Sequence, residues 1–208
     1  MTRLPTFCCC SYLILTVLVP GGREPVGRAD TLSRPARVAR PSNPVGTLFA
    51  ALSQCRRGLS ERERWRIAGV IHRESQRYGY DPLFVVALAA VESTCLPTAR
   101  SRHGAVGLIQ IRPSVARAVA QDAGVRWRGD HMLTKPLFNV HLGLRYLTQL
   151  EKRFGDPYLA MAAYNLGPTR VSGMSRHRAK TTQYVQKVLS RYETLLAQHR
   201  PRVSRADS

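Results

Sequence analysis

The chain has 208 residues, which is enough for one folded domain with its own core and extensions at its ends. Its 32 lysine and arginine residues against 13 aspartate and glutamate residues give a formal net charge of +19. The basic residues show no zinc-finger spacing, no basic region joined to heptads and no aromatic-rich strand pattern. Nucleic-acid binding therefore ranks last among the functions we weigh, and an anionic cell envelope is an equally good electrostatic partner.

The N-terminal segment has the composition of a secretory signal peptide. A basic start is followed by an uncharged apolar run over residues 7–19, which is too short for a comfortable transmembrane helix. We assign residues 1–22 to the signal peptide and expect the protein in the periplasm of a Gram-negative-type envelope. Val19-Pro20-Gly21 matches the small-x-small cleavage pattern poorly, so an uncleaved anchor is the alternative. Residues 23–45 contain four prolines and five arginines and are expected to form a disordered linker.

Two of the five cysteines, Cys55 and Cys95, lie beyond the predicted leader. An even pair of cysteines in an exported protein suggests a disulfide, and two unrelated buried thiols are the alternative. The six histidines show no metal-ligand spacing, so we assign no metal.

Helical patterns follow one another through residues 46–198, which we assign to one domain, with a flexible basic tail over residues 199–208. Ser60-Glu61-Arg62-Glu63 is a capping box that predicts a helix ending at Gly79. The predicted fold class is all-α, or α+β at most, with a small hairpin near residues 100–111 inside a loop. Further helices are predicted over about residues 112–123, 137–154, 158–166 and 184–196.

Glu92 is the most informative residue because of its place in the predicted helices. Asp81-Pro82 supplies an N-cap and a first-turn proline for a helix that is apolar on every face and ends at Glu92. The helix dipole and apolar surroundings both raise the pKa of a carboxyl group there, which suits a general acid at neutral pH. The alternative is a side chain that merely turns into water where the helix ends.

Four short motifs follow one another along the chain, and together they resemble the lytic transglycosylase domain of the soluble-lytic-transglycosylase type, which is related in fold to goose-type lysozyme. The resemblance covers about residues 67–192 and rests on agreement of residue type, order and spacing. The motifs are Glu92-Ser93, Ser101-x-x-Gly104-Ala105-x-Gly107-Leu108-Ile109-Gln110, Asn139-x-x-x-Gly143-x-x-Tyr146-Leu147 and Ala163-Tyr164-Asn165-x-Gly167-Pro168.

The resemblance implies a lysozyme-like helical domain with a groove for peptidoglycan glycan strands, and it implies no cofactor. Glu92 matches the family's catalytic acid. Three departures from the family's usual residues are Ile109 and Arg112 at positions where methionine is common, and Lys135 in place of an aspartate before proline. The residues matched to substrate binding are Ser93, Ser101, Gly107, Gln110, Tyr164 and Asn165.

Each match has a structural alternative. Gly107 could be an ordinary turn residue, although a backbone without Cβ would also let a sugar approach closely. Tyr164 could be a core aromatic residue and Asn165 a helix C-cap. Asn139 and Tyr146 are expected to be structural.

The distribution of carboxylates points to a mechanism with a single acid. Ordinary glycosidases use two carboxyl groups, but the N-acetyl oxygen of this substrate can stabilise the developing cation. Glu92 would protonate the glycosidic oxygen and then accept the proton of the C6 hydroxyl, which forms a 1,6-anhydro sugar. The other acids have other expected positions: helix caps for Asp81 and Asp156, a surface-like stretch for Asp122 and Asp130, and exposed helix faces for Glu151 and Glu193.

The predicted function is therefore that of a monomeric peptidoglycan lytic transglycosylase, which could open the wall for a secretion or conjugation apparatus. The first alternative is a hydrolytic muramidase of the same fold, in which water attacks in place of the C6 hydroxyl. The second is a non-catalytic scaffold protein that binds peptidoglycan.

Overall fold

The computed structural model describes residues 43–55 and 59–199, and the regular elements within these residues are all helices, which confirms the all-α fold class. The predicted signal peptide, most of the linker and most of the tail lie outside the described residues. None of the described helices combines the length and apolar character needed to cross a membrane. In chain order the elements are α1 (Pro44–Leu52), α2 (Glu61–Tyr78), α3 (Pro82–Ser93), α4 (Pro113–Asp122), the 3-10 helix η1 (Asp130–Thr134), α5 (Pro136–Phe154), α6 (Pro157–Leu166), α7 (Pro168–Val171), α8 (Arg176–Lys180) and α9 (Gln183–His199).

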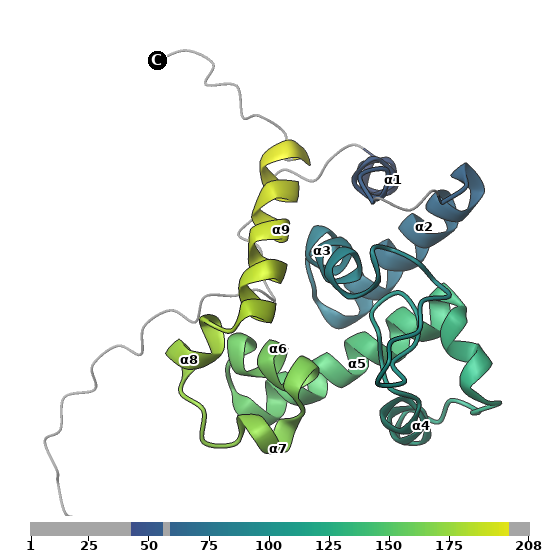
Figure 1. Cartoon of the computed structure of the whole chain (residues 1–208). Helices are drawn as coiled ribbons and strands as arrows, with labels where there is room; N and C mark the ends of the chain where they lie inside the picture. Colours follow the sequence, from purple (N-terminus) through teal and green to yellow (C-terminus); the bar gives the residue numbers. More distant parts are fainter. Residues whose placement is uncertain (1–42, 56–58, 200–208) are drawn as a thin grey trace, which may run out of the picture. The chain divides into compact units, whose positions relative to one another are not determined.

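Helix α3 is the core helix of this fold, and it packs against α1, α2 and α9 (Figure 1). Every residue from Leu83 to Ala89 is buried. A helix that is apolar all round has no face suited to water, so it is stable only when neighbours cover it on all sides. Helix α5 contacts α2, α4 and α6, so it joins the part of the core around α3 to the helices that follow it in the chain.

The predicted helix caps are present. The side chain of Glu63 accepts a hydrogen bond from the backbone N–H of Ser60 at 3.0 Å, and the hydroxyl of Ser60 accepts one from the backbone N–H of Glu63 at 3.3 Å. Gly79 ends α2 in the left-handed conformation, with φ of 77°. Asp81 and Asp156 each accept backbone N–H bonds at the start of their helices, which confirms their predicted structural role.

Helix α1 begins before the predicted end of the linker. Pro44, which the sequence analysis counts among the linker prolines, is the first residue of α1. Proline suits this position because its missing N–H would have no helical partner. The side chain of Asn43 caps the helix by accepting a bond from the backbone N–H of Gly46 at 2.8 Å. The described end of α9, His199, likewise lies one residue inside the predicted tail.

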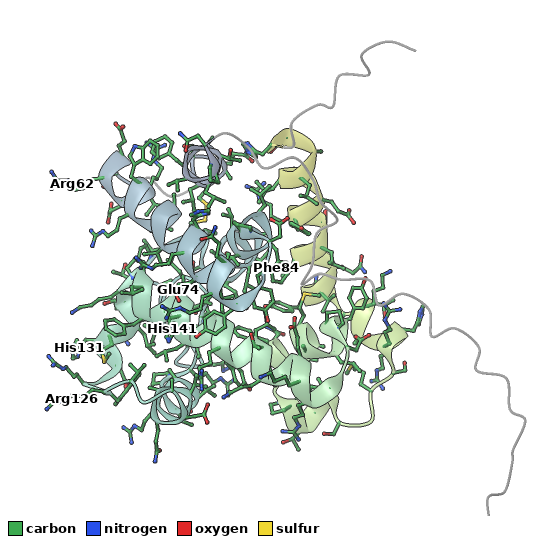
Figure 2. All side chains as sticks on the ribbon, turned by 180° about the vertical axis from the view of Figure 1, so that it is seen from behind. Arg62, Glu74, Phe84, Arg126, His131 and His141 are labelled. Atoms are coloured by element: carbon green, nitrogen blue, oxygen red, sulfur yellow. A yellow bond between two sulfur atoms is a disulfide. The ribbon has the colours of Figure 1, made fainter. Side chains whose placement is uncertain are left out.

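The segment between α3 and α4 is a compact loop rather than a regular hairpin. Its strand-like pairing consists of two isolated bridges, Arg100 with Val106 and Val106 with Ile111. A disulfide joins Cys95 in this loop to Cys55 after α1, with 6.0 Å between their Cα atoms (Figure 2). The predicted pairing is thereby confirmed, and the loop after Glu92 is tied covalently to the segment that follows α1.

Candidate active site

Glu92 lies in the last turn of α3, and its carboxyl group is partly buried. The hydroxyl of Tyr184, at the start of α9, donates a hydrogen bond of 2.6 Å to Oε1 of Glu92. Burial raises the pKa of Glu92 to about 7, and the bond from Tyr184 offsets part of that rise. The side chain of Glu92 is therefore not turned freely into water, which was the alternative in the sequence analysis. Near neutral pH the carboxyl group can give up or accept a proton.

Tyr184 and Tyr164 lie near Glu92 and stay protonated. Burial raises the pKa of Tyr184 and of Tyr164 well above the usual value, and the negative charge of Glu92 raises both further. Tyr184 therefore acts as a hydrogen-bond donor to Glu92 at every physiological pH. The sequence analysis counted Tyr184 only as an apolar position of the last helix, and helical periodicity carries no sign of a bond to a residue 92 positions earlier.

Helices α3 and α5 hold the Gly107–Gln110 loop beside the acid. The hydroxyl of Ser93 donates to the carbonyl of Leu108 at 2.7 Å. The side chain of Asn139 accepts from the N–H of Ile109 at 2.9 Å and donates to the carbonyl of Val106 at 2.8 Å. Asn139 is fully buried, so these bonds replace the water that its amide would otherwise require. The side chain of Ser93 is buried and hydrogen-bonded to the backbone of the loop, so it supports the loop.

Tyr164 on α6 completes this support. Its hydroxyl donates to the carbonyl of Ile109 at 2.8 Å. Gly143 on α5 leaves room for this arrangement, because a Cβ at that position would collide with the side chain of Ile109 and crowd the hydroxyl of Tyr164. The loop is therefore braced by side chains from three helices, α3, α5 and α6.

Gly107 and Gln110 occupy left-handed backbone conformations in the loop. The φ of Gly107 is 89°, and a Cβ there would collide with the amide of Asn139 and the carbonyl of Leu133. Glycine is thus required by packing against protein, whether or not a sugar also approaches. Gln110 has a φ of 47°, which is uncommon for a residue other than glycine. Its side chain donates to the carbonyls of Gly107 at 2.8 Å and Ala99 at 3.2 Å, which closes the loop.

Ser101 and Asn165 are the two matched residues whose side chains are exposed. The hydroxyl of Ser101 accepts a hydrogen bond from the backbone N–H of Ala105 at 3.0 Å, inside the turn that also contains Gly104. Asn165 lies in the last turn of α6, directly after Tyr164. These two side chains are accessible to a ligand, whereas Ser93 is bound within the protein.

The other acids that the sequence analysis weighed are occupied elsewhere. Asp122 accepts bonds from Arg145 at 2.8 Å and from Gln149 at 3.0 Å. Glu151 is partly buried rather than exposed as predicted, because it lies against Tyr80 between α5 and the core; burial raises its pKa, and the bond from Tyr80 lowers it. Within the described residues, none of these carboxyl groups is hydrogen-bonded to Glu92.

A buried acid that sequence reasoning missed is Glu74 on α2, whose side chain is 1% exposed. It pairs with Nδ1 of His141 on α5 at 2.9 Å and with the guanidinium groups of Arg73 at 3.2 Å and Arg77 at 3.7 Å (Figure 2). A buried charge is tolerated when it is paired in this way. Glutamate and histidine on two different helices give no local signal of such a contact.

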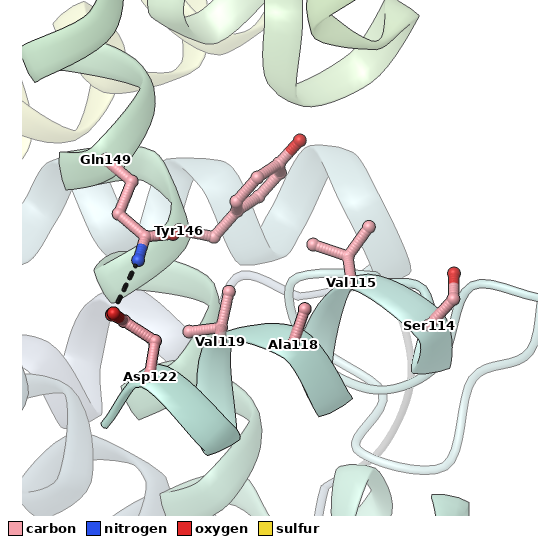
Figure 3. A pocket seen from close by; sticks show the side chains of 7 residues that line it. All are labelled: Ser114, Val115, Ala118, Val119, Asp122, Tyr146 and Gln149. Carbon is pink, nitrogen blue, oxygen red and sulfur yellow. Dashed lines mark hydrogen bonds between the residues drawn. The ribbon is translucent and has the colours of Figure 1, made fainter. Parts of the chain in front are cut away.

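A hollow of about 510 Å³ lies between α4 and α5, with the Tyr146 ring on its wall and Val115 and Ala118 opposite (Figure 3). The Tyr146 ring also lies 5.6 Å from the Tyr164 ring, measured between centroids, so this tyrosine stands between the hollow and the candidate site. Burial raises the pKa of Tyr146, and the positive charges of Arg153 and Arg112 lower it. The departure at Arg112 therefore adds positive charge beside Tyr146.

Comparison with known proteins identifies the family of the domain. A family model described as Transglycosylase SLT domain matches residues 69–187. The chain is 34% identical over 110 residues to the soluble lytic murein transglycosylase of Salmonella typhimurium, covering 50% of this chain and 17% of that protein. It is 30% identical over 132 residues to a transglycosylase of Enterobacteria phage PRD1, covering 64% of this chain and 45% of that protein. The chain thus spans less than half the length of these relatives.

Solved structures show the same fold. An inactive variant of the lytic transglycosylase Slt from Pseudomonas aeruginosa superposes with a TM-score of 0.57 and 28% sequence identity, covering 72% of this chain and 27% of that one. The soluble lytic transglycosylase of 70 kDa from Escherichia coli gives a TM-score of 0.56 at 24% identity, covering 62% of this chain and 24% of that one. The second likeness concerns the fold alone.

Proposed function

Because the chain belongs to the Transglycosylase SLT domain family, we propose that it is a lytic transglycosylase that cleaves the β-1,4 bond between MurNAc and GlcNAc in peptidoglycan. The observation that carries the proposal is a partly buried carboxyl group, Glu92, whose pKa is about 7 and which lies beside the braced Gly107–Gln110 loop. The products would be 1,6-anhydromuramoyl sugars. No cofactor enters the proposed reaction.

Glu92 is both acid and base in this reaction. A pKa of about 7 leaves about half of the carboxyl groups protonated near neutral pH. The protonated form gives its proton to the glycosidic oxygen as the bond from that oxygen to C1 breaks. The C6 hydroxyl of the same muramoyl residue then attacks C1, and its proton returns to Glu92. The acid is thereby regenerated and no water is consumed.

The absence of a second carboxylate from this scheme has a chemical reason. The N-acetyl oxygen of the substrate can stabilise the cation that develops at C1, a task that many glycosidases give to a second carboxyl group. An intramolecular hydroxyl held near C1 can have an effective concentration of about 10⁵ M or more, far above that of water. Cyclisation can therefore outrun hydrolysis even in a groove that is open to solvent.

The matched residues divide into two groups in this proposal. Ser101 and Asn165, whose side chains are exposed, are the ones we expect to bind the glycan directly. The supporting group shapes the groove wall by holding the loop beside the acid, through hydrogen bonds or through the space that glycine leaves. It consists of Ser93, Gly107, Gln110 and Tyr164.

Digestion of purified peptidoglycan followed by mass spectrometry of the released disaccharides tests the reaction. A lytic transglycosylase releases anhydro-disaccharides that are lighter by one water molecule than the products of hydrolysis. Hydrated, reducing disaccharides alone would identify the protein as a muramidase with Glu92 as its acid. Release of no disaccharide by folded protein would instead support the non-catalytic scaffold.

The cellular setting is part of the proposal. A leader-like N-terminus and a disulfide between Cys55 and Cys95 support an oxidising compartment outside the cytoplasm, and we propose the periplasm. Peptidoglycan strands are the proposed partner there. A role as a monomeric wall-opening enzyme for an envelope-spanning secretion or conjugation apparatus is a more specific proposal. It is tested by comparing assembly of such an apparatus with and without active Glu92.

A further inference from the structure

A second hollow, of about 330 Å³, lies where α6 ends and α7 and α8 follow. Apolar and cationic side chains share its lining: Leu166 and Met174 are apolar, and Arg170 and Arg178 are cationic. Its distinguishing feature is that two guanidinium groups from separate short helices line the same space. A fork of N–H donors on each of them suits a planar anion such as a carboxylate.

This hollow adjoins the candidate active site through the chain itself. Leu166 follows Tyr164 by two residues, and Thr182, which also lines the hollow, precedes Tyr184 by two residues. Two residues of chain span at most about 7 Å, so both ends of the hollow begin close to the tyrosines around Glu92. An extended peptide of several residues, carried by a sugar bound at Glu92, is long enough to span this separation.

Arg170 and Arg178 differ from Arg176 on α8 and from Arg145 on α5 in having no acidic partner among the described residues. Arg176 on α8 pairs with Asp156 at 2.7 Å, and Arg145 pairs with Asp122 at 2.8 Å. Within residues 43–55 and 59–199, neither Arg170 nor Arg178 forms an ion pair, and both side chains are exposed. Their positive charge is thus available to a ligand.

We infer that this hollow, named here the Arg170–Arg178 pocket, binds a free carboxylate of the peptide stem that the glycan strand carries. The inference rests on the proposed function, because it takes the glycan to be bound at Glu92. The sugar backbone offers neutral hydroxyl and amide groups, whereas peptide stems end in or carry carboxylates. Leu166 and Met174 offer apolar surface to the alanyl methyl groups of such a stem.

The larger hollow between α4 and α5 lacks this character. Asp122 contributes an acid to its lining, and that acid is already paired with Arg145. Its other lining residues are apolar or neutral, as Figure 3 shows for Val115, Ala118 and Tyr146. Of these two hollows, carboxylate recognition is therefore assigned to the Arg170–Arg178 pocket.

The test compares two substrates in the full chain: glycan strands with free stem carboxylates and strands whose stem carboxylates have been amidated. The variant is Arg170→Gln with Arg178→Gln. The matched control is Arg62→Gln with Arg66→Gln, which removes the same charge from exposed positions on α2, away from α7 and α8 in Figure 1. Arg170→Lys with Arg178→Lys keeps the charge and removes the fork.

We expect kcat/KM on strands with free carboxylates to fall about tenfold in the Gln variant, less in the Lys variant, and not in the control. The loss should shrink at high salt, because exposed charges are screened. Rates on amidated strands should change less than twofold. An equal loss on both substrates, or no loss on either, would overturn the inference.

Binding separates this inference from the proposed reaction. Calorimetry with Glu92→Gln protein and soluble muramoyl peptides measures affinity without turnover. The two Arg→Gln changes should weaken binding of the free acid about tenfold and leave the amidated peptide unaffected. If the wild-type protein cleaved no strand at all, the proposed function would fail, while this difference in binding would still decide the inference. Equal affinities for acid and amide would refute it.

Discussion

Two glutamates with restricted access to water, Glu74 and Glu92, show how the same side chain serves two purposes. Glu74 lies between α2 and α5, where it pairs with the guanidinium groups of Arg73 and Arg77 and with the imidazole of His141. The hydrogen-bond partner of Glu92, the neutral phenol of Tyr184, can donate to a carboxylate but carries no positive charge.

The difference shows that the partner, more than burial, decides the role of a buried acid. A carboxylate that is paired with arginines contributes to packing between helices, because the pairing offsets the cost of its burial. A carboxyl group that is buried without a cation has its pKa raised toward neutrality, and proton transfer then becomes possible at physiological pH. Substitutions of Glu92, Glu74 and Tyr184 test this difference between the two acids.

Glu92→Gln should abolish lysis of peptidoglycan. The change keeps the volume and hydrogen-bonding capacity of the side chain but removes the transferable proton, and loss of general acid function costs about 100-fold to 10,000-fold. Turbidity of a wall suspension measures the rate, and circular dichroism checks the fold. Near-normal lysis by the folded variant would show that the acid lies elsewhere.

The same variant should alter how stability depends on pH. The pKa of Glu92 is raised to about 7 in the folded protein, so this group favours the fold fully below its ordinary pKa of 4.5, and that stability is lost as pH rises through 7. By linkage the loss is up to roughly 3 kcal/mol. Melting temperatures between pH 4 and 9 should show Glu92→Gln gaining on the wild type as the pH rises from about 4.5 to about 7, and keeping that gain at higher pH. Parallel curves would mean that the carboxyl group is not desolvated.

Glu74→Gln should lower the stability of the fold and leave the specific activity almost unchanged. It leaves His141 and two arginines without their acid, so we expect a loss of about 1 to 3 kcal/mol in the free energy of unfolding. Because the site around Glu92 is untouched, lysis per folded molecule should stay within about twofold. Urea titration measures the stability. A large drop in specific activity without a drop in stability would contradict the structural role.

Tyr184→Phe should give the smallest effect. The hydroxyl bond favours the charged carboxylate, so its removal should move the pKa of Glu92 further upward. The alkaline limb of the kcat/KM profile should shift to higher pH, and the maximal rate should fall about fivefold, as expected for one hydrogen bond. A rate profile over pH 5–9 measures both. A shift of the limb to lower pH would mean that the bond stabilises the protonated acid.

Local patterns were sufficient to predict most of the helices and Glu92. Helix starts are predicted by capping residues that are close in sequence, namely Ser60 with Glu63, Asp81, and Asp156. The apolar run before Glu92 predicts a buried helix. Contacts between distant segments have no such signal. The bond from Tyr184 to Glu92, the buried amide of Asn139 and the pairing of Glu74 with His141 depend on packing that periodicity does not encode.

Two predictions, the end of the linker and the exposure of Glu151, were wrong for local reasons. Pro44 was assigned to the linker because proline is common in disordered segments, but it begins α1 after the Asn43 cap. Glu151 was assigned to an exposed face because charged residues usually are exposed, but Tyr80 covers it.

Under the proposed function, the crosslink between Cys55 and Cys95 would tie the timing of wall-degrading activity to the redox state around the protein. Cys95 is three residues beyond Glu92, and the bond closes a span of 40 residues, which should contribute about 4 kcal/mol on the chain-entropy model. In a reducing cytoplasm the newly made chain lacks this brace beside its acid. We therefore expect maturation to depend on the oxidants of the compartment where the substrate lies, so that the chain gains its full stability where it meets its substrate.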